Sequence, residues 1–293
     1  MARCQCWGPT RQYTGPSSVC HFANDLPFNV SCSLDQYADD STLSCTEPSS
    51  SKITSVLMEN CSTVSTWMNQ NELCLNADKT KLMITGTSQR VSHVRKEQHI
   101  RVEMSGLELS ESESNCEMLL GVVFETNLKW NKHVQQLQKK LKDRLSGLRK
   151  VRFLVNMKHR KILAESIVQS VLTFCITVWG GTGKGNVEQL QVLQNETARI
   201  VLNKPRRCHR ETLFSMLNWL TVNQLVAFHR ILAIYELKRT GEPEYLAQLV
   251  SKENIRRKII IPNTNSSLLR RSLIVHGSEL WNYILEQVKQ RET

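Results

Sequence analysis

A change in the spacing of apolar residues near residue 126 most constrains the fold of this chain. Beyond that point, apolar residues recur three or four apart, and they are Val134, Leu137, Leu141, Leu145, Leu148 and Val151. This spacing predicts an amphipathic helix, and similar patterns predict helices over 159–178, 187–202, 211–219, 221–238 and 277–289, with a strand over 258–261. The rear of the chain is therefore expected to be nearly all-helical.

The front of the chain contains shorter segments of mixed type. A turn between two short strands is expected over 33–43, an amphipathic helix over 53–69, and strand, turn and strand over 73–85. A polar hairpin is expected over 89–114 and a buried strand over 118–124. Together the two parts predict an α+β protein with domains 1–125 and 126–293.

Charge divides the chain at nearly the same place. Residues 1–125 hold 9 Lys and Arg against 15 Asp and Glu, a net charge of −6, whereas residues 126–293 hold 29 against 12, a net charge of +17. A strongly basic rear favours a polyanionic partner, with nucleic acid the first candidate and an anionic membrane surface the second.

The cysteines and the first residues favour a reducing, intracellular setting. None of the ten cysteines forms a Cys-x-x-Cys pair, which argues against a zinc module. The first six residues lack the apolar run of a secretory signal. The most apolar stretch, 167–179, is short and predicts a buried helix rather than a membrane span.

One acidic stretch, Tyr37-Ala38-Asp39-Asp40, indicates chemistry. Two adjacent carboxylates in a tight turn can hold divalent metal against phosphate oxygens. By itself the pattern fits a solvated surface turn better than a metal site, because Asp favours turns and hydrogen-bonds its own backbone.

Further motifs stand before and after the acidic turn. Before it comes Phe22-Ala23-Asn24-Asp25-Leu26-Pro27. After it come, in order, Trp67-Met68 with Asn76 and Lys79-Thr80, Leu120-Gly121-Val122 with Trp130 and His133, Val178-Trp179-Gly180, Gln191 with Gln194-Asn195, and Trp281-Asn282. In this order the chain resembles the reverse transcriptase of non-LTR retrotransposons, especially jockey-like elements. The resemblance runs from Pro16 onward and implies the rear of a polymerase palm over 1–125 and a thumb with a C-terminal region over 126–293.

The resemblance also implies a reaction, RNA-directed DNA synthesis by two-metal nucleotidyl transfer. Asp39 and Asp40 would be the Mg²⁺ ligands, and Lys79 would neutralise the leaving group. RNA template, DNA primer and deoxynucleoside triphosphates would be the partners. A solvated role for Lys79, and core packing instead of primer contact for Trp130 and His133, remain open.

Two departures argue against an active polymerase. Family members carry a further palm motif with another metal-binding Asp, and no residue here replaces that Asp. Thr10-Arg11-Gln12 also stands where the family has Gln-Gly-Ser. Because the members of a catalytic unit act together, we expect the chain to be inactive alone.

Two alternatives to the polymerase stay open. The first is a non-catalytic nucleic-acid-binding protein that uses its basic helices, through Lys139, Lys140, Arg144, Arg206 and Arg207, although such charges also suit a solvated helix face. The second is a chain whose front half cannot fold, because half a palm leaves strand edges unpaired.

Overall fold

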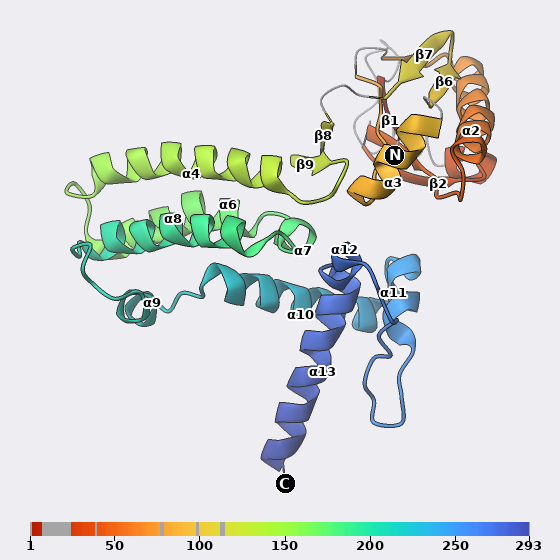
Figure 1. Ribbon diagram of the computed structural model, residues 1–293. Helices are drawn as coiled ribbons and strands as arrows, with labels where there is room; N and C mark the ends of the chain where they lie inside the picture. Colours follow the sequence, from red (N-terminus) through yellow and green to blue (C-terminus); the bar gives the residue numbers. More distant parts are fainter. Residues whose placement is uncertain are drawn as a thin grey trace. The chain divides into compact units, whose positions relative to one another are not determined.

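The computed structural model describes residues 2–7, 25–38, 40–76, 79–97, 100–111 and 115–292. The chain divides into two compact units, residues 1–128 and 129–293. The first combines short antiparallel strands with helices, and the second is helical (Figure 1). The α+β class expected from the sequence is therefore observed.

A five-stranded antiparallel sheet organises the first unit. Its order is β2 (Ser33–Tyr37), β3 (Asp40–Ser44), β1 (Ala2–Trp7) and β4 (Cys74–Leu75), with β5 (Lys81–Leu82) also paired to β1. In the β2–β3 hairpin, Leu34 pairs with Leu43 and Tyr37 pairs with Asp40. The predicted turn between two short strands is confirmed as this hairpin.

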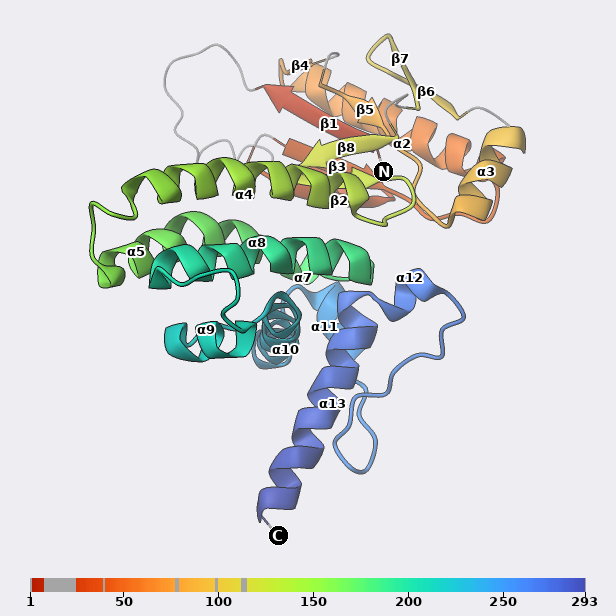
Figure 2. The ribbon, with the colours of Figure 1, turned by 60° about the vertical axis from the view of Figure 1, so that its left-hand side comes forward.

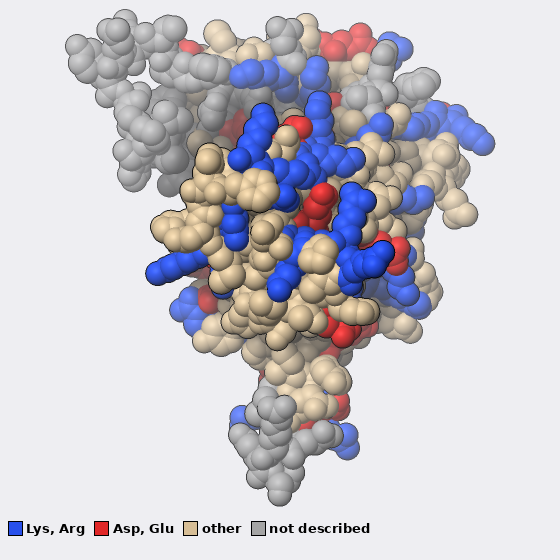
Figure 3. Space-filling view, turned by 90° about the vertical axis from the view of Figure 1, so that its left-hand side faces the viewer, with Lys and Arg blue, Asp and Glu red and all other residues tan. Residues whose placement is uncertain are grey.

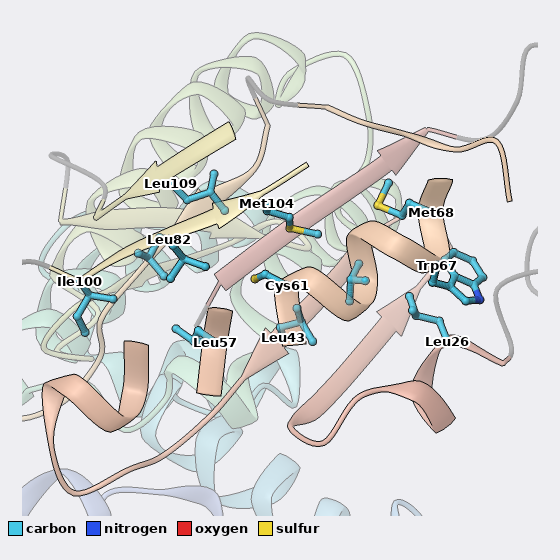
Figure 4. Packing of buried hydrophobic residues seen from close by; sticks show 12 residues of the cluster. Leu26, Leu43, Leu57, Cys61, Trp67, Met68, Leu82, Ile100, Met104 and Leu109 are labelled. Atoms are coloured by element: carbon cyan, nitrogen blue, oxygen red, sulfur yellow. The ribbon is translucent and has the colours of Figure 1, made fainter. Parts of the chain in front are cut away.

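Helix α2 (Ser50–Gln70) packs on the sheet through the apolar stripe predicted for 53–69. Its first turn is capped by Ser49, whose side chain accepts a hydrogen bond from the Lys52 N–H. Leu57 and Cys61 are buried in one cluster with Leu43 of the sheet (Figure 4). This cluster forms the core of the first unit.

The rest of the first unit corrects two predictions. Its elements are the 3₁₀ turn η1 (Leu26–Asn29), α3 (Ser88–Glu97), the hairpin β6 (Arg101–Met104) with β7 (Leu107–Ser110), and the hairpin β8 (Cys116–Leu119) with β9 (Val122–Glu125). The first part of the expected polar hairpin is instead helix α3, in which Val91 is buried and Val94, one turn away, packs on the core. The expected single strand over 118–124 is a hairpin that turns at Leu120 and Gly121, both with positive φ.

The second unit consists of helices. They are α4 (Asn131–Val151), α5 (Met157–Ala164), the π-helical η2 (Glu165–Gln169), α6 (Ser170–Thr173), α7 (Ile176–Trp179), α8 (Lys184–Leu202), α9 (Arg210–Leu217), α10 (Val222–Thr240), α11 (Glu244–Ser251), α12 (Ser267–Arg270) and α13 (Leu273–Glu292). Figures 1 and 2 show α4 lying along α8, and α10 packs against α8, α7 and α13.

The helix predicted over 159–178 is divided. The α-helical ladder loosens into η2 and breaks at Phe174 and Cys175, where Cys175 has a left-handed φ of 48°. The indole N–H of Trp179 donates to the Phe174 carbonyl at 2.8 Å, so a buried tryptophan satisfies a group exposed by the break. The strand expected over 258–261 is a single bridge between Glu253 and Ile259.

The described residues contain no helix that is both long enough and apolar enough to cross a membrane. The stretch 167–179 is instead packed within the helical unit, where Val168, Leu172 and Ile176 are buried.

Candidate functional site

The acidic turn lies at the closed end of the β2–β3 hairpin. Tyr37 and Asp40 are its last paired residues, and Ala38 between them has a left-handed φ of 54°. A positive φ at the first loop residue suits the tight two-residue turns that follow the twist of the strands. The predicted metal ligand Asp39 is the second loop residue and lies outside the described residues.

Asp40 lies on the sheet face opposite helix α2. Side chains alternate along a strand, so paired residues share one face and residues three apart take opposite faces. Leu34 and Leu43 face the core beneath α2. Tyr37 and Asp40 therefore face the other way, where Tyr37 is 67% exposed and Asp40 is half-buried. Tyr37 and Asp40 thus lie on the face away from the core under α2.

The strand beside the turn supplies no carboxylate. Strand β1 pairs with β3 so that Gln5 lies opposite Asp40, and its sequence is Ala-Arg-Cys-Gln-Cys-Trp. Within the described part of the chain, no three His, Cys, Asp or Glu side chains gather where a metal ion could bind. The residues described at this turn offer one carboxylate, Asp40, and do not by themselves fit a two-magnesium site.

Lys79 lies on the other side of β1 from Asp40. It belongs to the segment between β4 and β5, both of which pair with β1. Its backbone N–H donates to the carbonyl and side-chain oxygens of Asn76, each at 3.2 Å, and its side chain is exposed. Strand β1 thus lies between the strand that carries Asp40 and the segment that carries Lys79.

Two of the sequence motifs meet through a hydrogen bond. The indole N–H of Trp67 in α2 donates to the Asp25 carboxylate at 3.1 Å. Asp25 immediately precedes η1, where Leu26 is buried. Asp25 thus fixes the segment before β2 onto α2.

Trp130 and His133 at the start of α4 are core residues. Both are buried, and the rings of His133 and Trp179 pack with centroids 5.8 Å apart. Burial, and secondarily the positive charge of Lys140, lowers the pKa of His133 to about 4. Of the two roles left open by the sequence, the geometry matches core packing.

The motif glutamines of α8 stabilise the start of α10. Gln194 is buried and donates to the Leu220 carbonyl at 2.9 Å, while Gln191 accepts from the Val222 N–H at 2.9 Å and donates to Gln194. Thr221 between those two contacts caps α10 with Gln224 in a capping box. These family-like residues therefore have a structural role in this chain.

Sequence reasoning missed a buried arginine. Arg230 in α10 is 2% exposed, and burial lowers its pKa to about 10. It donates to the Arg271 carbonyl at 2.9 Å. The available signal was its position within the apolar stripe of α10, between Val226 and Ile234.

The basic residues expected to meet nucleic acid differ in their contacts. Lys139, Lys140, Arg206 and Arg207 are exposed. Arg144 instead donates to the Ile167 carbonyl at 2.6 Å, which satisfies a carbonyl in the π-helical segment. Figure 3 shows Lys and Arg spread over the end of the helical unit.

The fold and these surfaces define a two-unit α+β protein with an acidic hairpin turn and a basic helical unit. The chain is similar to the probable RNA-directed DNA polymerase from transposon BS of Drosophila melanogaster, with 25% identity over 235 residues. The match covers 75% of this chain and 25% of that protein, so the chain spans about a quarter of its curated relative. This similarity supports a relationship to transposon reverse transcriptases. No family model matches the chain, and no solved structure matches it significantly.

Proposed function

We propose that these residues form the rear of the palm and the thumb of a reverse transcriptase from a non-LTR, jockey-like retrotransposon. The observation that carries the proposal is the match over 235 residues to a transposon polymerase. The position of Tyr37 and Asp40 supports it, because an acidic turn exposed at the end of a hairpin is accessible to a large substrate. Template RNA, primer DNA and deoxynucleoside triphosphates are the partners that this function implies.

We further propose that the chain by itself does not extend a primer. Asp39 and Asp40 are the candidate Mg²⁺ ligands and Lys79 the candidate leaving-group residue. However, strand β1 places Gln5 rather than a carboxylate opposite Asp40. Two-metal catalysis depends on ligands that hold both ions together, so an incomplete set loses several orders of magnitude in rate.

A primer-extension assay tests this proposal. Purified chain is incubated with an RNA template, a labelled DNA primer, deoxynucleoside triphosphates and Mg²⁺, and the expected result is binding of the template–primer without extension. RNA-templated synthesis that the Asp39→Ala variant abolishes would overturn the inactive part. Absence of any template–primer binding at low salt would overturn the assignment itself.

A second candidate function is non-catalytic nucleic-acid binding through the basic helical region. It is favoured by the exposed side chains of Lys139, Lys140, Arg206 and Arg207, none of which forms an ion pair with a described residue. Binding that neutralises phosphates weakens steeply as salt rises. The discriminating measurement compares template–primer with unprimed RNA, since a polymerase-derived protein prefers the primed substrate and a general binder does not.

A further inference from the structure

Two connections meet at one end of the helical unit. The α4–α5 turn comprises residues 152–156, and the α8–α9 loop comprises residues 203–209. Arg160 of α5 joins the turn to the last turn of α8, because its guanidinium donates to the Val201 carbonyl at 2.9 Å and to the Arg152 carbonyl at 2.5 Å. The ion pair of Arg149 with Glu196 also connects α4 to α8. We call the turn and the loop together the helix-end surface.

The helix-end surface exposes an aromatic ring. Phe153 is 74% exposed and Leu154 is 80% exposed, whereas the apolar stripe of α4 is buried. The Arg152 guanidinium lies 4.2 Å from the centroid of the Phe153 ring, in cation–π contact. A ring supported by Arg in this way is a flat platform on which a nucleobase can stack.

The helix-end surface and the helix turns beside it are strongly basic. Their cations are Lys150, Arg152, Lys158, Lys204, Arg206 and Arg207. Among the residues that the structure describes, no carboxylate forms an ion pair with any of these six. Figure 3 views this end of the unit and shows many Lys and Arg, with fewer Asp and Glu, among exposed uncharged side chains. Cations without an ion-pair partner on the same surface as an exposed aromatic ring match a chain of phosphates with accessible bases.

We propose that the helix-end surface binds an unpaired nucleic-acid strand, with Phe153 as a stacking platform and Arg206 and Arg207 as phosphate contacts. A duplex fits less well, because its bases are already stacked on each other and cannot cover the ring. An anionic membrane also fits less well, since interfacial helices insert a whole apolar face and that of α4 is buried. The inference rests on the nucleic-acid binding in the proposed function.

Fluorescence anisotropy with the full chain tests the stacking role. The probes are a labelled 20-nucleotide oligouridine RNA and a duplex of equal length, and the single strand is expected to bind more tightly. Phe153→Ala and Phe153→Leu should each weaken single-strand binding by about fivefold or more, while Phe153→Trp retains it. Phe174→Ala, which removes a 49% exposed aromatic elsewhere in the unit, is the matched control. Full binding by Phe153→Leu, or tighter binding to the duplex, would overturn the proposal.

A salt titration tests the phosphate contacts. Arg206→Ala/Arg207→Ala should lower the slope of log Kd against log salt concentration by about 1.4, the value for two contacts to a single strand. The control Lys184→Ala/Lys252→Ala removes two exposed charges, one of them at the opposite end of α8, and should keep the slope. Equal slopes for both double variants would contradict the site.

Two outcomes separate this inference from the proposed function. Template–primer binding that none of the helix-end variants changes would remove the inference alone, whereas no nucleic-acid binding at low salt would remove both. Sedimentation with phosphatidylserine vesicles, without binding to oligouridine, would identify a membrane surface and overturn the inference.

Discussion

The Arg230 guanidinium donates to Nδ1 of His276 at 2.9 Å, which joins α10 to α13 inside the helical unit. This geometry requires His276 to be neutral, since Nδ1 must accept. Burial, followed by the charge of Arg230, lowers the pKa of His276, although Glu279 opposes the shift. Arg230 also donates to the Arg271 carbonyl, so one side chain anchors the segment leading into α13.

We predict that Arg230→Met destabilises the chain by about 3 kcal/mol, because buried acceptors on His276 and Arg271 lose their donor. Urea unfolding followed by circular dichroism measures the loss. Arg239→Ala is the control in the same helix, because its ion pair with Glu236 lies on the surface and contributes little to stability. Equal losses in both variants would contradict the anchoring role.

The buried His133 predicts a loss of stability in acid. Its folded pKa of about 4 lies below the ordinary value of 6.5, so the unfolded state binds more protons between these two values. Stability is therefore complete above pH 6.5 and falls as the pH drops toward 4, by about 2 kcal/mol at pH 5. Urea unfolding at pH 7.5 and pH 5 should show a smaller difference for His133→Phe than for the unchanged chain. An unchanged difference would show that His133 does not contribute.

Gly180 permits close packing between the α7–α8 region and α10. A methyl group at this position would overlap the Ile176 carbonyl and lie 2.9 Å from Val226. Gly180→Ala should therefore cost about 1–3 kcal/mol. Gly147 in α4 has no neighbour within 4 Å of the same methyl position, so Gly147→Ala should instead stabilise by about 1 kcal/mol. Thermal melts of the two variants are expected to shift in opposite directions.

Asn60 in α2 fixes the start of β2, and with it the acidic hairpin. Its buried side-chain oxygen accepts from the backbone N–H groups of Ser31 at 2.7 Å and Cys32 at 3.2 Å. Asn60→Ala should cost about 2–3 kcal/mol and speed hydrogen exchange at Ser31 and Cys32. Asn69→Ala changes an exposed residue of the same helix and should alter neither. Slow exchange in Asn60→Ala would mean that other contacts hold the hairpin.

Burial raises the pKa of the Cys61 thiol to about 12, whereas Cys74 is exposed. Because the thiolate is the nucleophile, iodoacetamide at pH 8 should alkylate Cys74 well before Cys61. Peptide mass spectrometry resolves the two sites. Alkylation of Cys61 in the folded chain at the rate of Cys74 would contradict the packing of the first core.

The sequence predicted elements whose signals are local. The apolar stripes of α4 and α2 follow from residues within one or two turns of each other, so spacing was sufficient. Prediction from local spacing failed where packing between distant residues outweighed the local pattern. The helix over 159–178 breaks at Phe174 and Cys175, where the indole of Trp179 donates to the Phe174 carbonyl. Ser88–Glu97 is helical, with Val91 buried and Val94 packed on the core.

At the acidic turn, the sequence determined which residues are present and that a hairpin presents them. The motif order related them to a polymerase family, and the charge division indicated a polyanionic partner. Only the tertiary structure decided that β1 places Gln5 opposite Asp40, that Asp25 bonds to Trp67, and that His133 is buried. These facts depend on contacts between residues far apart in the chain, and the free energy of such contacts comes from excluding water from surfaces that no local spacing specifies.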